Sequence, residues 1–358
     1  MTMADKYKLD PHSAAILKEY REQRPVFEKM QETLPAQVRA LFDEAGIIVA
    51  SIESRIKEEA SLAGKLELKG AKYASLEDIT DVFGIRIITF YTDDVDKVAS
   101  GVERLFEVDW ENSVDKRKLL EVDSFGYLSL HYICRAPDFP YRFEVQMRTI
   151  LQHAWANMNH DTGYKTGVEV PVEYLRNMNR LAGMLELVDE QFSRIRTEIN
   201  DYRRQVQSLV ASGRLEEVPL DGDSYRSFLN LAPFDSLNRR IASVNQAEIQ
   251  DVNLMPFLAV FKTLGFKTLG DLADLIRDYS EAAYQIACYQ IALTDLDILA
   301  SSVAPQNLCL AYLLKQGAGR AGIRLMLDTL HGASESNDAM AEIILEQAKD
   351  FSFMHSKS

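Results

Sequence analysis

The sequence predicts an α+β domain followed by an all-α domain, and three observations support this. Strand patterns are confined to the first half of the chain, between residues 84 and 148. The segments on either side of this region carry apolar residues at helical spacing. Beyond residue 240 only helical patterns with short, glycine-marked turns are found.

Composition limits the function classes. The chain has 358 residues, 47% of them hydrophobic, which is enough for a large core and indicates two domains. A net charge of −14 argues against non-specific nucleic-acid binding, although a local basic pocket can still hold a nucleotide. The three cysteines form no CxxC pair, so neither a disulfide framework nor a structural zinc site is predicted. The sequence has no signal-type N-terminus and no long apolar run, so we expect a cytoplasmic protein with no membrane partner.

Helices are predicted at the start of the chain and after the strands. Residues 12–30 and 34–65 are rich in helix formers with apolar residues at helical spacing, and Pro35 marks a turn between them. Another helical stretch runs from residue 149 to about residue 207, with a break near Pro171.

The strands are predicted from their period-two patterns. Residues 84–91 are almost continuously apolar, whereas residues 126–136 and 141–148 alternate and are joined by the loop sequence "APDFP". The last two therefore form a hairpin. An amphipathic helix over residues 95–106 follows the first strand, which indicates an α/β crossover.

Glycine, proline, aspartate and serine concentrate in residues 212–236, where we place a domain boundary. The predicted organisation is a first domain over residues 1–211, a linker over 212–240, and an all-α domain over 241–358 with a regulatory or oligomerisation role. The last domain has no cluster of histidine, cysteine or carboxylate side chains that suggests catalysis, and its aromatic and leucine residues are most simply core.

Two strands of the first domain carry an unusual polar face. In "YRFEVQMR", the residues Glu144, Gln146 and Arg148 share one side by period two. In "GYLSLHY", Tyr127 and His131 do the same. A solvated surface would explain either strand alone, but two polar faces on paired strands favour a walled site. The helix that follows places His153, and then His160, beyond this site.

A third segment, "SLEDITDVFGIRI", adds a carboxylate and a cation. Asp81 precedes a buried strand that contains Arg86, and an arginine in an apolar strand must be paired or must face a ligand. Carboxylates that hold Mg²⁺ and cations that neutralise phosphate oxygens together indicate phosphoryl transfer. Asp81 and Glu144 are the candidate carboxylates. The candidate cations are Arg55, Lys57, Lys65 and Arg86.

The spacing of Lys57, Ser61 and Lys65 predicts that they line one face of a helix. The alternative for that face is a solvated helix with Lys/Glu pairs.

Four segments in this order resemble the synthetase motifs of the RelA/SpoT family of ATP pyrophosphokinases, which make the alarmones (p)ppGpp. They are "SRIKEEASLAGK", "DITDVFGIRI", "GYLSLHY" and "FEVQMRTILQHAWANMNHDTGYK", and the resemblance covers about residues 45–166. It implies a nucleotidyltransferase-like synthetase domain with a mixed β-sheet flanked by helices. It also implies transfer of the β,γ-pyrophosphate of ATP to the 3′-hydroxyl of GDP or GTP.

The resemblance further implies the roles of individual residues. Asp81 and Glu144 would hold Mg²⁺, and Glu144 or a water bound to it would accept the 3′ proton. ATP would be bound by Arg55 and Arg86 at its adenine and by Lys57, Ser61 and Lys65 at its phosphates. The base of the acceptor would stack on Tyr127. The rest of the acceptor would be bound by His131, Gln146 and Arg148, and by Lys116 in place of a lysine that many family members have elsewhere. His153 and His160 would support the site.

The chain departs from the family at two positions. Asp123 and Phe125 stand where many members have lysine and asparagine, and the lysine would contact acceptor phosphates. Lys116, or the neighbouring Arg117 or Lys118, is expected to compensate. The chain lacks the HD-type hydrolase half of the long members, so we expect synthetase activity without hydrolysis.

Three functions remain open. The first is a small alarmone synthetase that uses GDP or GTP. The second applies the same chemistry to another acceptor such as the 3′ end of tRNA, which Asp123 favours and the acidic charge disfavours. The third is a non-catalytic nucleotide-binding module. A homo-oligomer is also open at this stage.

Overall fold

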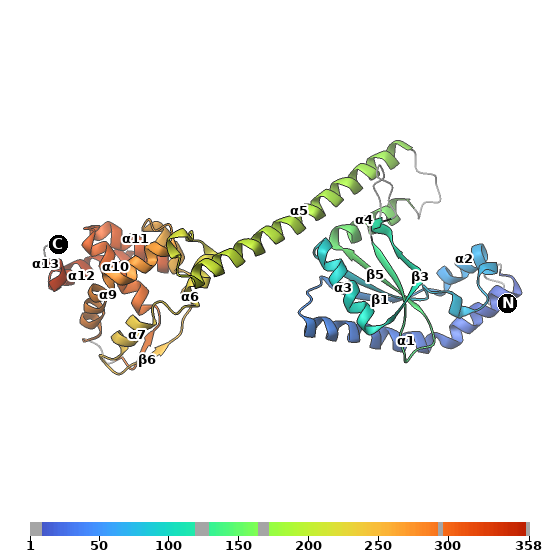
Figure 1. The fold of residues 1–358 in the computed structure, drawn as a ribbon, viewed down its shortest axis with the longest axis horizontal. Helices are drawn as coiled ribbons and strands as arrows, with labels where there is room; N and C mark the ends of the chain where they lie inside the picture. Colours follow the sequence, from blue (N-terminus) through green and yellow to red (C-terminus); the bar gives the residue numbers. More distant parts are fainter. Residues whose placement is uncertain (1–8, 119–128, 164–171, 293–295, 356–358) are drawn as a thin grey trace. The chain divides into compact units, whose positions relative to one another are not determined.

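A computed structural model describes residues 9–118, 129–163, 172–292 and 296–355. The chain divides into two compact units, Met1–Thr197 and Glu198–Ser358, each with a hydrophobic core of its own (Figure 1). Within the described residues, no helix is both long enough and apolar enough to cross a membrane.

The first unit is built on a five-stranded mixed sheet with strand order β1-β2-β5-β4-β3. β2 and β5 pair in parallel and the other neighbours are antiparallel, so the predicted crossover and hairpin are both confirmed. The strands are β1 (Ser51–Ile56), β2 (Phe83–Thr89), β3 (Glu107–Asp115), β4 (Leu130–Arg135) and β5 (Phe143–Thr149).

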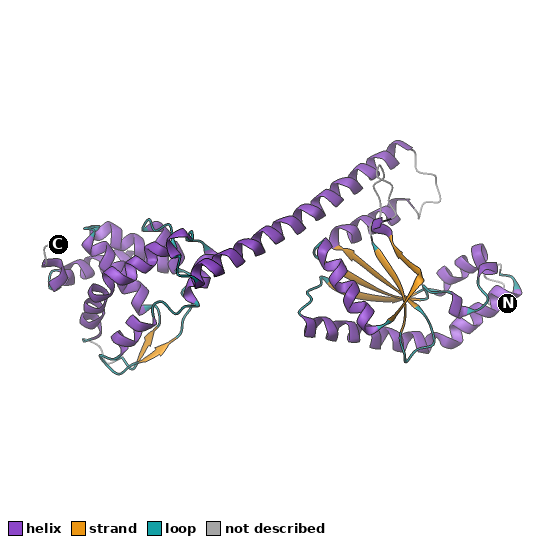
Figure 2. Ribbon diagram, viewed as in Figure 1, coloured by secondary structure: helices purple, strands orange, loops and turns teal. Residues whose placement is uncertain are grey.

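Helices flank this sheet, as the sequence predicts (Figure 2). Phe27 and Phe42 of α1 and Val98 of α3 are buried in one core with the strand residues Ile85 and Val145. This apolar packing turns the other face of the strands, which carries the polar residues, away from the core. The helices of this unit are α1 (Pro11–Ala45), α2 (Glu59–Lys69), α3 (Thr92–Leu105), α4 (Ile150–Gly163) and the start of α5 (Val172–Ala211).

The first helices differ from the prediction. α1 continues through Pro25 and Pro35 because its buried stripe, which includes Met30 and Leu34, packs across both prolines. It ends where Gly46 takes a left-handed conformation with φ of 66°, which glycine adopts without strain.

The residues after Gly46 also differ, since the predicted helix over 34–65 is a helix, a strand and a second helix. β1 was missed because its alternation is short, and β3 because its exposed, polar residues give little hydrophobic pattern.

The second unit is helical, as predicted, apart from two short parallel strands, β6 (Glu248–Gln250) and β7 (Ile298–Ala300), that were not predicted. Its core gathers apolar side chains from all its longer helices. These helices are α6 (Gly222–Leu229), α7 (Asp235–Ala242), α8 (Phe257–Thr263), α9 (Leu269–Ile291), α10 (Val303–Lys315), α11 (Gly319–His331), α12 (Glu335–Ala348) and α13 (Ser352–His355).

The expected linker over residues 212–240 is part of this second unit. Tyr225, Phe228 and Phe234 are buried in its core, so the segment is packed rather than extended. The polar residues that suggested a linker are helix caps, since the carboxylate of Asp221 accepts hydrogen bonds from the first backbone amides of α6. The units divide instead within α5, between Thr197 and Glu198.

Candidate active site

Strand register brings four polar residues into one row on the face of the sheet away from the core. Glu53 of β1 lies opposite Arg86 of β2, Arg86 opposite Gln146 of β5, and Gln146 opposite His131 of β4. The side chains interact along the row. The Arg86 guanidinium donates to Glu53 Oε2 over 3.3 Å and to Gln146 Oε1 over 3.5 Å. The strand arginine, whose side chain is 24% exposed, is therefore paired, as its position required.

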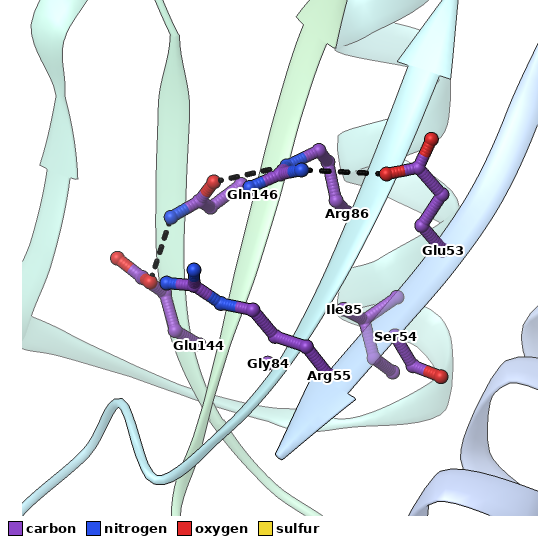
Figure 3. A pocket seen from close by; sticks show the side chains of 8 residues that line it. All are labelled: Glu53, Ser54, Arg55, Gly84, Ile85, Arg86, Glu144 and Gln146. Carbon is purple, nitrogen blue, oxygen red and sulfur yellow. Dashed lines mark hydrogen bonds and ion pairs between the residues drawn. The ribbon is translucent and has the colours of Figure 1, made fainter. Parts of the chain in front are cut away.

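A second row, two residues further along each strand, contains a hollow. Arg55, Gly84 and Glu144 lie opposite one another in β1, β2 and β5. Because Gly84 has no side chain, a hollow opens between the two charged residues, with Arg55 extending across it toward Glu144 (Figure 3). Its walls also include Glu53, Ser54, Ile85, Arg86 and Gln146.

Asp81 lies between two lysines. Lys57 Nζ is 2.5 Å from Asp81 Oδ2, and Lys65 Nζ is 2.7 Å from Asp81 Oδ1. Burial opposes the charge on Asp81, but the lysines outweigh it and hold the pKa of the carboxyl below its usual value. Lys65 also lies over the ring of Tyr73, 5.3 Å from its centroid.

The two lysines differ in their proton affinity. Burial lowers the pKa of Lys57 despite its contact with Asp81. For Lys65, burial is outweighed by Asp81 and Tyr73, and the pKa is raised.

Glu144 is held by a chain of hydrogen bonds. His131 Nδ1 is 2.7 Å from Glu144 Oε1, the Gln146 amide donates to Glu144 Oε2 over 2.8 Å, and His131 Nε2 is 2.5 Å from Ser129 Oγ. The imidazole of His131 therefore bridges the two side chains, with one ring nitrogen on the Glu144 carboxylate and the other on the Ser129 hydroxyl. Burial raises the pKa of Glu144, but His131 and Gln146 more than offset this, so the pKa is lowered and the carboxylate is ionised.

The order Ser129–His131–Glu144 has the connectivity of a nucleophilic triad. Ser129 is fully buried, however, so a substrate has no access to its hydroxyl. We therefore assign Ser129 to orienting His131.

The two carboxylates are close enough to affect each other, since the charge of Asp81 raises the pKa of Glu144. Among the described residues, no group of three or more histidine, cysteine, aspartate or glutamate side chains is arranged to hold a metal ion. Two ionised carboxylates nevertheless fit Mg²⁺, which proteins commonly bind through one or two carboxylates together with substrate phosphates. The donor set present is compatible with that ion.

Several predicted site residues lie elsewhere or are less available. Lys57 precedes α2, so it does not share a helical face with Ser61 and Lys65, although both lysines meet at Asp81. Ser61 is an exposed residue of α2. Arg117 does not provide a spare cation, because it pairs with Asp96 and Asp115.

Other predicted residues surround the hollow without lining it. Arg148 is only 2% exposed and lies on β5 one row beyond Gln146. Its charge acts on His153 of α4, whose pKa is lowered by burial, by Arg148 and by Arg86. Lys116 lies at the end of β3, where its backbone amide donates to Ser129.

The remaining predictions fall outside what the structure describes. Tyr127, Asp123 and Phe125 lie outside the described residues, as do the side chains of Lys118 and His160.

Three residues of the site were not among the predicted ones. Glu53 pairs with Arg86, Tyr73 underlies Lys65, and Ser129 orients His131. Ser129 had a usable signal, since it shares the polar face of its strand with His131. Glu53 had none, because its partner Arg86 lies 33 positions away in the sequence. Tyr73 follows α2, and no motif in the sequence links it to Lys65.

The region that carries the site is similar to known proteins. Residues 54–169 match the family model described as a region found in RelA / SpoT proteins. The chain is 27% identical over 157 residues to GTP pyrophosphokinase YjbM of Bacillus subtilis (strain 168), covering 42% of this chain and 73% of that protein. It is 24% identical over 206 residues to GTP pyrophosphokinase YwaC of the same organism, covering 52% and 94%.

Solved structures were also compared. The small alarmone synthetase 1 from Bacillus subtilis gives a TM-score of 0.45 at 22% identity, covering 51% of this chain and 98% of that one. The small alarmone synthetase 2 from the same organism gives 0.45 at 24%, covering 50% and 99%. The matched residues 54–169 include both site carboxylates and both site lysines. Residues 54–169 therefore match the family that the motifs predict.

Proposed function

We propose that the chain is an ATP pyrophosphokinase that transfers the β,γ-pyrophosphate of ATP to the 3′-hydroxyl of GDP or GTP, with Mg²⁺ as cofactor. The observation that carries the proposal is the cluster of Lys57, Lys65 and Asp81 beside an ionised Glu144. Two ammonium groups can neutralise a polyphosphate, and two ionised carboxylates can hold its cation. The curated relatives YjbM and YwaC, named GTP pyrophosphokinases, support the same reaction.

The residues of the hollow would bind the donor. Arg55 and Arg86 present planar guanidinium groups at its rim, which suits stacking on the adenine. Lys57 and Lys65 would exchange Asp81 for the phosphates of ATP. Mg²⁺, when bound at Asp81 and Glu144, would neutralise charge on the transferred group.

Glu144 would accept the proton in the transfer. The 3′ oxygen of the acceptor attacks the β-phosphorus, the bond from that phosphorus to the α–β bridging oxygen breaks, and AMP leaves. The proton of the 3′-hydroxyl passes to the ionised carboxylate of Glu144, which His131 and Gln146 hold in place.

The acceptor's identity rests on the relatives and on residues outside the described part of the chain. Tyr127 would stack on the acceptor base, and Lys116 would meet its phosphates. Asp123, which stands where a lysine is usual, makes a tRNA 3′ end the second candidate acceptor.

Transfer of label from γ-³²P-ATP to GDP, GTP and bulk tRNA, each offered alone with Mg²⁺, tests the proposal. We expect labelled guanosine 3′-diphosphate products with the nucleotides. The Glu144→Gln variant should give none. Label on tRNA alone would contradict the guanine nucleotide assignment and retain the chemistry, whereas no label on any acceptor would contradict the activity.

The Asp123→Lys variant adds a second comparison. If GTP is the acceptor, the KM for GTP should fall about tenfold, because a repulsion with its 5′ phosphates is replaced by an attraction. A gain for tRNA that disappears at high salt, with none for GTP, would instead support the tRNA end.

A further inference from the structure

A stripe of large apolar side chains lies exposed along α5, within the first unit. Its members are 40% to 63% exposed and follow one another at intervals of three or four residues, so they line one side of the helix. Continuous exposed apolar surface of this kind marks an interaction site in water. The stripe consists of Leu181, Met184, Val188, Phe192 and Ile195.

A different face of α5 attaches the helix to its own unit. Thr149 donates to Asp189 over 2.5 Å, the hydroxyls of Ser193 and Thr92 lie 2.6 Å apart, and Arg196 pairs with Asp94. The residues of this attached face lie about 100° around the helix from the stripe. The stripe is therefore left uncovered by the contacts that fix the helix.

All members of the stripe except Met184 belong to a longer heptad pattern. From Tyr174 to Leu209, an apolar residue recurs at alternating intervals of four and three without interruption. A repeat of this kind over about five heptads is the seam of a coiled coil. Its members are Tyr174, Met178, Leu181, Leu185, Val188, Phe192, Ile195, Ile199, Tyr202, Val206 and Leu209.

The apolar residues of this pattern differ in their exposure to solvent. Near the C-terminal end, Val206 is 2% exposed and Leu209 packs against the core of the second unit. Val188, Phe192 and Ile195 carry the same pattern but remain about half exposed. Within the described part of the chain, the seam from Val188 to Ile195 thus lacks the cover that Val206 and Leu209 have.

We propose that a second copy of this chain covers the seam, so that two α5 helices form a coiled-coil dimer along residues 181–195. A heptad seam is self-complementary, because the same stripe on a symmetry-related helix supplies holes for its knobs. About half of the surface of five large side chains is exposed, which amounts to roughly 400–500 Å² of apolar surface per copy. With the flanking residues, the dimer would bury about 1,200 Å² in total, which is near the lower end of stable interfaces.

The test is the self-association of the full chain, measured by analytical ultracentrifugation over a wide concentration range. We expect the wild-type protein to sediment with twice the mass of one chain. The double variant Val188→Glu/Ile195→Glu should raise the dimer dissociation constant at least about 100-fold, since it places charges in the seam.

Leu187 provides a matched control on the same helix. It is 56% exposed but lies about 100° around the helix from the seam, so Leu187→Glu should leave the dissociation constant unchanged. Circular dichroism and pyrophosphate transfer in all variants check that the fold is retained.

Three results would overturn the proposal. They are a wild-type chain that stays monomeric at every concentration, equal loss of association in the control and the double variant, and association that the double variant leaves intact.

Discussion

Replacing Asp81 with asparagine should damage both activity and stability, for separate reasons. The substitution keeps the shape of the side chain but removes the charge that Lys57 and Lys65 share. The lysines would then face each other as uncompensated cations, and the candidate cation site would lose one of its two carboxylates.

The size of the stability effect follows from the burial of the cluster. The side chains of Lys57, Asp81 and Lys65 are 15%, 28% and 25% exposed. Removing one partner of a fully buried pair costs about 3–5 kcal/mol, and partial exposure reduces this to about 2 kcal/mol. For a unit of this size, that free energy corresponds to a fall in Tm of roughly 4–8 °C. The kcat should fall at least about 100-fold, as when a preorganised charge is lost from a transition state.

Asp94 offers a matched control in the same unit. Its carboxylate is also buried and also pairs with two cations, Lys97 and Arg196, but it lies outside the site. Asp94→Asn should lower Tm by a similar amount and leave kcat within about twofold. Adding Lys57→Met to Asp81→Asn should recover part of the lost stability, because it removes one of the two ammonium groups that lose their carboxylate, without recovering activity.

Calorimetry and steady-state kinetics at saturating Mg²⁺ separate these outcomes. Near-native turnover of the Asp81→Asn protein would refute the assignment of Asp81 to the cation site. An unchanged Tm would refute the electrostatic account of the lysine cluster.

Four further outcomes are expected. Gly84→Leu should raise the KM for ATP at least about tenfold, because the longer side chain fills the hollow. It should have little effect on folding, since a Cβ there meets nothing nearer than a backbone oxygen at 3.5 Å. Nucleotide titration calorimetry checks this. Ser129→Ala should lower kcat about three- to tenfold and leave the KM for ATP unchanged, because His131 loses the bond that orients it; a twofold change in KM with none in kcat would contradict this. Mg²⁺ should bind at least about tenfold more weakly without nucleotide than with a non-hydrolysable ATP analogue, because two lysines occupy Asp81 in the free protein; calorimetry with and without the analogue decides it. The pKa values of Asp81, Asp94 and Glu144 are lowered in the folded state. These carboxylates therefore stabilise the folded protein fully above the ordinary carboxyl range near pH 4, and the stabilisation is lost as the pH falls through their pKa values in the folded state. Urea midpoints between pH 7 and pH 3 measure the loss.

The sequence predicted those elements whose residues alternate strongly between core and site. β5 was predicted because Phe143, Val145 and Met147 alternate with polar residues, and the hairpin followed from the short loop before it. β1 and β3 escaped because strand identity there depends on the neighbouring strand. The boundary was misplaced because the same residue types serve as linkers and as helix caps, and only packing tells the two apart.

The site could be predicted one strand at a time but not across strands. Alternation placed Glu144 with Gln146, and it placed His131 on a polar face of its own strand. Register then decides which of these residues meet, and it sets Gln146 between Arg86 and His131. A single sequence carries no information on register between strands whose residues are 33 positions apart, which is why the pairing of Glu53 with Arg86 was not foreseen.

Lys57 shows how a correct residue can follow from an incorrect geometry. The spacing of four suggested a helical face shared with Lys65, but Lys57 lies before α2 and approaches Asp81 from the end of β1. Opposite charges bring the two lysines to one carboxylate from two elements, and a polyphosphate offers them a larger negative charge than Asp81 does. Under the proposed function, a nucleotide would replace the contacts that Asp81 makes with the two lysines. A cation bound at Asp81 would then compete with the lysines until the phosphates drew them away.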